Sequence, residues 1–287
     1  MVLRAAALAI VCILWIAPSL GAAPIPVQFT EGVSRGFLTL RSQDGGKLAD
    51  GDILQTLKGE VVESRLVFHF VDGSLYDETV AFSQHRVCTL QRYHLVQRGP
   101  SFSIRLDISF DRETGQYKGR YADEDGGEKT LGGTIEMPPD LYNGMIAMLL
   151  RNLPRGASET VQMVTFTPKP RLVKLHLSPL GEEPMLVGDA SRSAIHYQAV
   201  PEIFGFLGFF VSLIGQKPPT LHFWITREEI PALLGFEGPL FFGGPVWRVG
   251  SNYRTERPRE VSQKSIDASE TRLGHLCHVK TGSPPPS

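Results

Sequence analysis

The sequence predicts a mainly β protein: one large curved antiparallel sheet, an open barrel or a sandwich-like meander, with two apolar helices packed on its concave face. Three observations lead to this fold class. Many runs alternate between apolar and polar residues, short turns rich in glycine and aspartate separate them, and proline bounds two apolar segments. The clearest run is SIRLDISF at 103–110, which places Ile104, Leu106, Ile108 and Phe110 on one face. Such alternation is typical of a strand with one buried and one solvated side.

The same alternation recurs along the chain in RLVFHFV, GQYKGRYAD, VQMVTFT, RLVKLHL, SAIHYQAV and TLHFWIT. Turn sequences lie between these runs at 71–73 (VDG), 111–115 (DRETG) and 123–127 (DEDGG). Short strands joined by such turns form hairpins, and we expect roughly ten to thirteen strands. So wide a sheet has to curl or fold over, because a flat one would expose long edges.

Two segments break the alternation and predict helices. The first, PPDLYNGMIAMLLRNLP at 138–154, has a proline suited to a first helical turn, an apolar centre and a terminating Pro154. The second runs from Pro201 to Gly215 and contains FGFLGFFVSLIG, which carries no charge. Glu202 suits the positive end of this helix, and Gly215 ends it. Its twelve apolar residues would rise about 18 Å, against roughly 30 Å of membrane hydrocarbon, so this helix is too short to span a bilayer.

The ends of the chain differ in composition from its centre. Arg4 is followed by the apolar run AAALAIVCILWI and then by Gly21 and Ala23, an arrangement typical of a secretory signal peptide. We therefore expect a signal peptide at 1–23, a single β-rich domain at 24–250 and a flexible polar tail at 251–287. Export follows from the signal, and we place the protein in the periplasm rather than in the medium. No membrane anchor is expected once the signal is removed.

Charge and cysteine content exclude several classes of protein. The chain has 29 Lys and Arg against 30 Asp and Glu, whereas nucleic-acid binding favours a basic surface, so no nucleic-acid partner is expected. Two cysteines remain after signal removal, Cys88 and Cys277, and we favour no bridge between them. The sequence contains no G-x-S-x-G, S-x-x-K, H-E-x-x-H or C-x-x-C motif and no glycine-rich phosphate loop. We expect no catalytic residue, no metal site and no cofactor.

Five histidines fall within strand-like runs, at 69, 94, 176, 196 and 222. Several of them facing one cavity could serve as acid and base or bind a metal. No two are spaced as a local ligand pair, so we interpret them as scattered surface residues.

The phenylalanine-rich segment is the candidate for ligand binding. It either fills a solid core or covers a cavity that holds a hydrophobic molecule, and both possibilities stay open. Its glycines favour a cover, because each weakens a helix by up to about 1 kcal/mol relative to alanine. On this hypothesis the ligand-binding residues are Phe204, Phe206, Phe209 and Phe210, joined by Trp224 and Trp247.

Two segments of the sequence resemble known proteins. HFWITREEIPALLGFEGPLFFGGPVWRV at 222–249 and FVDGSLYDETVAFSQHRVCTLQRYHLVQRGPSF at 70–102 resemble uncharacterised exported bacterial proteins of the cell envelope. The predicted architecture is also similar to that of periplasmic lipoprotein-carrier half-barrels, in which a curved sheet wraps helices that cover an acyl-chain cavity. That second likeness concerns architecture alone, and it implies no site residue.

These observations favour a non-enzymatic periplasmic protein that binds a lipid or another hydrophobic molecule between the sheet and the helices. A hydrolase or transferase acting on an envelope substrate is the alternative, and a structural or assembly factor of the envelope is the third possibility. The sequence leaves the oligomeric state and the identity of the ligand open.

Overall fold

The computed structural model describes residues 24–122, 126–166, 169–187, 189–202 and 219–250. These residues form fourteen strands and one helix. In chain order they are β1 (Ser34–Arg41), β2 (Lys47–Lys58), β3 (Val61–Phe70), β4 (Leu75–Ser83), β5 (Thr89–Arg98), β6 (Arg105–Asp111), β7 (Gln116–Ala122), β8 (Glu128–Thr134), α1 (Ile146–Asn152), β9 (Glu159–Phe166), β10 (Pro170–Val187), β11 (Ala190–Pro201), β12 (Leu221–Thr226), β13 (Leu233–Gly238) and β14 (Trp247–Gly250).

All fourteen strands belong to one antiparallel sheet that does not close. Its order is β8-β7-β6-β5-β4-β3-β2-β1-β14-β13-β12-β11-β10-β9, so β8 and β9 are its two ends. The β1–β14 pairing joins two meanders, one made of β1 to β8 and the other of β9 to β14. The prediction of a large antiparallel β-sheet is confirmed, and the number of strands slightly exceeds the expected range.

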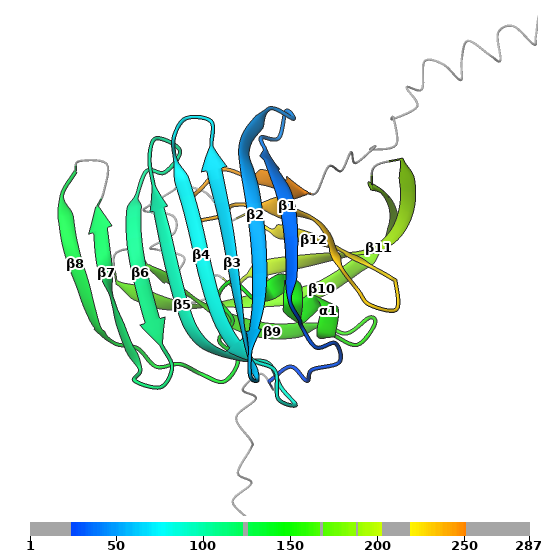
Figure 1. Ribbon diagram of the computed structural model, residues 1–287, viewed down its shortest axis with the longest axis horizontal. Helices are drawn as coiled ribbons and strands as arrows, with labels where there is room; N and C mark the ends of the chain where they lie inside the picture. Colours follow the sequence, from blue (N-terminus) through cyan, green and yellow to red (C-terminus); the bar gives the residue numbers. More distant parts are fainter. Residues whose placement is uncertain (1–23, 123–125, 167–168, 188, 203–218, 251–287) are drawn as a thin grey trace, which may run out of the picture.

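The sheet folds over so that the two meanders face each other. Figure 1 shows β1 to β8 side by side as one curved layer, with β9 to β12 running across behind it. Ring contacts connect the two layers: Phe166 in β9 lies 6.4 Å from Phe110 in β6 and 6.0 Å from Tyr117 in β7, measured between ring centroids. One large apolar cluster fills the space between the layers, because both inner faces present the apolar half of each alternating strand.

The first predicted helix is much shorter than expected. Residues 138–145 are not helical, and α1 is confined to Ile146–Asn152. Asn143 binds the backbone of β9 through both atoms of its amide group, and Gly144 has a positive φ of 67°. Both features are incompatible with a regular helix at these residues. Leu141 instead forms an isolated parallel bridge with Gln162. The apolar, proline-bounded pattern is thus divided between a strand-like segment and two turns of helix.

The expectation of two helices is wrong for the part of the chain that the structure describes, which contains α1 alone. The predicted start of the second helix, Pro201, is the last residue of β11 and pairs with Leu175. A proline is tolerated at such a strand end because its missing N–H removes no bond from the interior of the ladder. The remainder of that prediction, including FGFLGFFVSLIG, falls mostly on residues 203–218, which lie outside the described residues.

The segment that precedes β1 is fixed to both the sheet and α1. Pro26 bridges Val87, and the backbone N–H groups of Gln28 and Phe29 donate to Asn152 Oδ1 at 2.7 and 2.9 Å. Glu31, whose side chain is 4% exposed, pairs with Arg151 at 2.5 Å. The segment therefore contributes buried polar contacts to the fold.

Cys88 is buried, and its Sγ lies 3.5 Å from Met148 Sδ. Burial raises the pKa of its thiol to about 11, which makes it a poor nucleophile at neutral pH. Cys277 lies outside the described residues, so the expected absence of a bridge between the two stays a prediction.

Candidate functional site

Trp247 lies inside the filled part of the core. Its ring is 5.4 Å from Phe70, 6.2 Å from Phe102 and 5.9 Å from Phe241 between centroids, and 6% of the residue is exposed. These four aromatic residues pack mainly edge-on or tilted, the arrangement that aromatic rings prefer in protein interiors. In the described residues Trp247 therefore packs as a core residue.

Trp224 lies on the opposite face of the sheet. Phe223 points into the main core, and Trp224, the next residue of β12, packs with Met185, Ala194 and Leu234 in a separate small cluster. The alternation along a strand imposes this separation. The structure therefore does not bring the two tryptophans together in one cavity. The four predicted phenylalanines, Phe204, Phe206, Phe209 and Phe210, lie outside the described residues.

The inner face of β1 to β4 carries a row of side chains that stay partly exposed. Strand register aligns Gly36, Ile53, Leu66 and Glu78 as cross-strand neighbours, and each of them is partly exposed. In the same row, Leu95 and Ile108 on β5 and β6 are buried. Along this one row the inner face is thus covered over β5 and β6 and only partly covered over β1 to β4.

Glu78 is the one carboxylate in this row. Tyr93 donates a hydrogen bond from its hydroxyl to Glu78 Oε1 at 2.7 Å, and the Tyr76 hydroxyl also stabilises the ionised carboxylate. Burial outweighs both of these effects and raises the pKa of Glu78 above its usual value. Burial and the nearby Glu78 charge raise the pKa of both tyrosines as well. The site thus presents a carboxyl group that holds its proton to higher pH than an exposed glutamate would.

The segment before α1 covers one side of Glu78. A Cβ atom added at Gly144 would lie 3.1 Å from the Glu78 Cδ and 2.5 Å from the Val80 Cγ2. The neighbouring Asn143 donates to the Val164 carbonyl and accepts from the Val164 N–H, both at 2.8 Å. The segment therefore connects the carboxylate on β4 to strand β9 of the opposite layer, and the site lies between the two layers.

This arrangement is typical of a site for a largely apolar molecule with one polar group. Ile53 and Leu66 offer partly exposed apolar surface, and Glu78 with Tyr93 offers a hydrogen-bonding pair next to it. Small-molecule sites are commonly lined by apolar side chains with a few polar groups that fix orientation. A protonated carboxyl group can donate a hydrogen bond, and an ionised one can only accept.

Glu78 was not among the site residues predicted from the sequence, although a signal for it was present. In LYDETVAF at 75–82, the alternation that places Tyr76, Val80 and Phe82 on one face also places Glu78 there. A carboxylate on the apolar face of a strand is costly unless it is hydrogen-bonded, and such groups are often functional.

The histidines are not all scattered as expected. His196 Nε2 lies 2.9 Å from His222 Nδ1, and His196 Nδ1 lies 3.2 Å from Glu183 Oε1. The Trp224 ring stacks on His196 at 4.6 Å between centroids, and its N–H donates to Glu183. Partial burial lowers the pKa of His196, although the charge of Glu183 opposes this effect. This cluster occupies the outer face, away from Glu78.

Comparison with known proteins found no matching family model, no matching curated protein and no matching solved structure. The resemblance to exported envelope proteins stays a prediction. Among the described residues, no helix is long and apolar enough to cross a membrane.

Proposed function

We propose that the protein is a non-enzymatic binder of a lipid or another hydrophobic molecule, which it holds on the concave face of the sheet in the periplasm. Ile53 and Leu66 contact the apolar part of the ligand, and Glu78 with Tyr93 binds its polar group. The observation that carries the proposal is the partly exposed row on the inner face, apolar except for one carboxyl group with a raised pKa. Burial of apolar surface supplies most of the binding energy, at about 25 cal/mol per Å².

The open sheet supports the proposal. Its two ends, β8 and β9, are not paired with each other, so the two layers can separate without breaking a continuous ladder. The β1–β14 pairing joins the layers along one side, and elsewhere they are connected through the hydrogen bonds of Asn143 to Val164 and through packed side chains. Entry of a ligand between them requires side-chain rearrangement and leaves the strand pairing intact.

The test is uptake of a fluorescent fatty-acid probe, together with mass spectrometry of lipids extracted gently from the purified protein. We expect co-purified lipid and saturable probe binding. Leu66→Trp fills the inner face and should weaken probe binding at least tenfold. Leu54→Trp places the same ring on the neighbouring strand, where Leu54 is 45% exposed on the outer face, and should leave binding unchanged.

Two results would sink the proposal. One is a protein that purifies free of lipid and does not bind the probe. The other is equal weakening by Leu66→Trp and Leu54→Trp, which would indicate adsorption to the surface.

A second candidate function is a hydrolase or transferase that acts on an envelope substrate. The observation that favours it is the contact between His196 and His222 beside Glu183, because a histidine pair with a carboxylate can transfer protons. Loss of turnover of an ester or glycoside substrate in His196→Gln, with probe binding unchanged, would support this candidate.

A further inference from the structure

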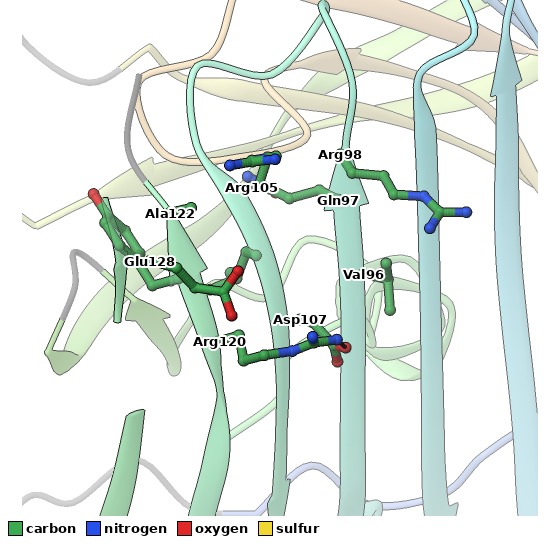
Figure 2. A pocket seen from close by; sticks show the side chains of 10 residues that line it. Val96, Gln97, Arg98, Arg105, Asp107, Arg120, Ala122 and Glu128 are labelled. Atoms are coloured by element: carbon green, nitrogen blue, oxygen red, sulfur yellow. Dashed lines mark hydrogen bonds and ion pairs between the residues drawn. The ribbon is translucent and has the colours of Figure 1, made fainter. Parts of the chain in front are cut away.

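The inner face carries a second polar side chain near Glu78. Gln97 of β5 pairs with Tyr76 of β4 and with Leu106 of β6, which both belong to the main core, so its side chain lies on the inner face. Only 3% of the residue is exposed. In Figure 2, a view of the pocket beside β5 and β6, the Gln97 side chain extends toward β6, whereas that of Arg98 extends in the other direction. Gln97 therefore belongs to the space between the two layers, as Glu78 does.

The amide oxygen of Gln97 lacks a hydrogen-bond partner. Gln97 Nε2 donates to the Ile104 carbonyl at 2.9 Å. A carbonyl can only accept, so this bond fixes which end of the amide is the oxygen. Gln97 Oε1 is buried and has no partner within the described residues. Buried acceptors are nearly always hydrogen-bonded, and an exception of this kind is a candidate for contact with a ligand.

Glu78 and Gln97 are placed to contact one ligand. Glu78 pairs with Leu95 across the β4–β5 ladder, so Tyr93 and Gln97 are its two diagonal neighbours on β5. Diagonal neighbours lie about 7–8 Å apart, within the reach of long side chains. The hydrogen bond of 2.7 Å between Tyr93 and Glu78 is made in this way. A polar group of a few atoms can therefore reach the acceptors of both Glu78 and Gln97.

The site offers acceptors for a ligand and disfavours an anion. The hydroxyl groups of Tyr93 and Tyr76 both direct their hydrogens to Glu78, so they are already used. Among the described residues, no lysine or arginine forms an ion pair with Glu78. A carboxylate or phosphate of a ligand would meet the like charge of Glu78 without a compensating cation. A group that donates hydrogen bonds would instead find two acceptors, Glu78 and Gln97 Oε1.

We propose that the hydrophobic ligand has a polar group with at least two hydrogen-bond donors and no negative charge, as the glycerol group of a monoacylglycerol has. One hydroxyl donates to Glu78 and the other to Gln97 Oε1, while the acyl chain lies on Ile53 and Leu66. This inference rests on the proposed function of the inner face and adds the chemistry of the polar group. A fatty acid also binds through its chain, but more weakly, because its carboxylate faces Glu78.

The test compares three ligands that share a chain of twelve carbons: 1-monododecanoylglycerol, 1-dodecanol and dodecanoate. Each displaces the fluorescent fatty-acid probe from the protein at about pH 8, where dodecanoate is ionised. The monoacylglycerol should bind at least tenfold more tightly than dodecanoate and at least threefold more tightly than the alcohol. Glu78→Gln removes the like charge and should bring the monoacylglycerol and dodecanoate within threefold of each other.

Gln97→Leu tests the second acceptor. It should weaken the monoacylglycerol at least threefold and leave the alcohol unchanged, because the alcohol has a single donor. Gln198→Leu is the matched control: Gln198 pairs with His222 on the outer face and donates to Ser178, so its replacement should change nothing. Leu66→Trp should weaken all three ligands alike, since it acts on the chain.

The possible failures are distinguishable. If neither the probe nor any of the three ligands binds, the proposed function is wrong and this inference falls with it. If the ligands bind and Leu66→Trp weakens them, but dodecanoate binds as tightly as the monoacylglycerol, only the inference about the polar group is overturned. Equal effects of Gln97→Leu and Gln198→Leu on the monoacylglycerol would overturn it as well.

Discussion

Replacement of Gly144 by alanine tests the contact between the segment before α1 and β4. Gly144 has a φ of 67°, a left-handed conformation that costs an alanine roughly 1–2 kcal/mol. The new Cβ would also lie 2.5 Å from Val80 Cγ2, a distance that real Cβ contacts essentially never show, and Val80 is 3% exposed and has little room to move. Overpacking of this kind costs typically 1–3 kcal/mol. We therefore expect Gly144→Ala to lower the free energy of unfolding by about 2–5 kcal/mol.

Gly156→Ala is the matched control. Gly156 has a φ of 76°, close to that of Gly144, but an added Cβ would meet nothing within 4 Å. It should therefore show the backbone penalty alone, and urea denaturation of both variants separates the two contributions. Val80→Ala in the Gly144→Ala background should recover part of the loss, because the two sites are in contact. Equal costs for Gly144→Ala and Gly156→Ala would refute the predicted clash.

Three further predictions concern buried polar groups. Because the pKa of Glu78 is raised on folding, its carboxyl favours the native state below its unfolded pKa near 4.5, and this contribution is lost as pH rises through the folded pKa. Glu78→Gln should flatten that part of the stability–pH curve measured by urea denaturation, and an unchanged curve would contradict the raised pKa of this carboxyl group. Arg151→Ala leaves Glu31 buried without its partner and should cost about 3–5 kcal/mol, with partial recovery in the double variant Glu31→Gln/Arg151→Met. Thermal unfolding of the wild type and of both variants checks this ordering. Asn143→Ala removes both partners of the Val164 backbone and should cost about 2–4 kcal/mol, with faster hydrogen exchange at the Val164 amide; protection equal to wild type would count against this role.

Most strands were predictable because they have one buried face. Of the predicted set Ile104, Leu106, Ile108 and Phe110, the last three are buried in β6, whereas Ile104 precedes β6 and is partly exposed. Strand alternation contains no information on which distant strands pair. The contact of β1 with β14 joins segments about 200 residues apart and depends on the turns and packing of the whole sheet.

The helices were less predictable because their signals are ambiguous. Proline at 201 is compatible with the first turn of a helix and with the end of a strand. Its pairing with Leu175 of β10 makes it the end of a strand. The 138–154 segment contains an asparagine–glycine pair at 143–144, which is a turn signal. The prediction of a helix relied on the surrounding apolar residues and gave this signal too little weight. Tertiary hydrogen bonds to β9 select the non-helical form.

The candidate site was predictable only in part. A hydrophobic site on the concave face was expected from the curved sheet and stays a prediction. Trp224 and Trp247 were assigned to it on aromatic character alone, without regard to their faces. The sequence alternation alone places the Glu78 carboxylate on the same face of the strand as Tyr76 and Val80. Its tyrosine partner Tyr93 comes from the next strand, and only the register between β4 and β5 brings the two together.

Methyl NMR gives the most direct test of a hydrophobic site on the inner face. A long-chain alcohol is titrated into protein labelled at isoleucine and leucine methyl groups, and the shifts of Ile53, Leu66 and Leu54 are followed. The methyl resonances of Ile53 and Leu66 should shift together and saturate at one dissociation constant. The methyl resonances of Leu54, which lies on the outer face, should not shift. Saturable shifts at Leu54 with none at Ile53 and Leu66 would contradict binding on the concave face.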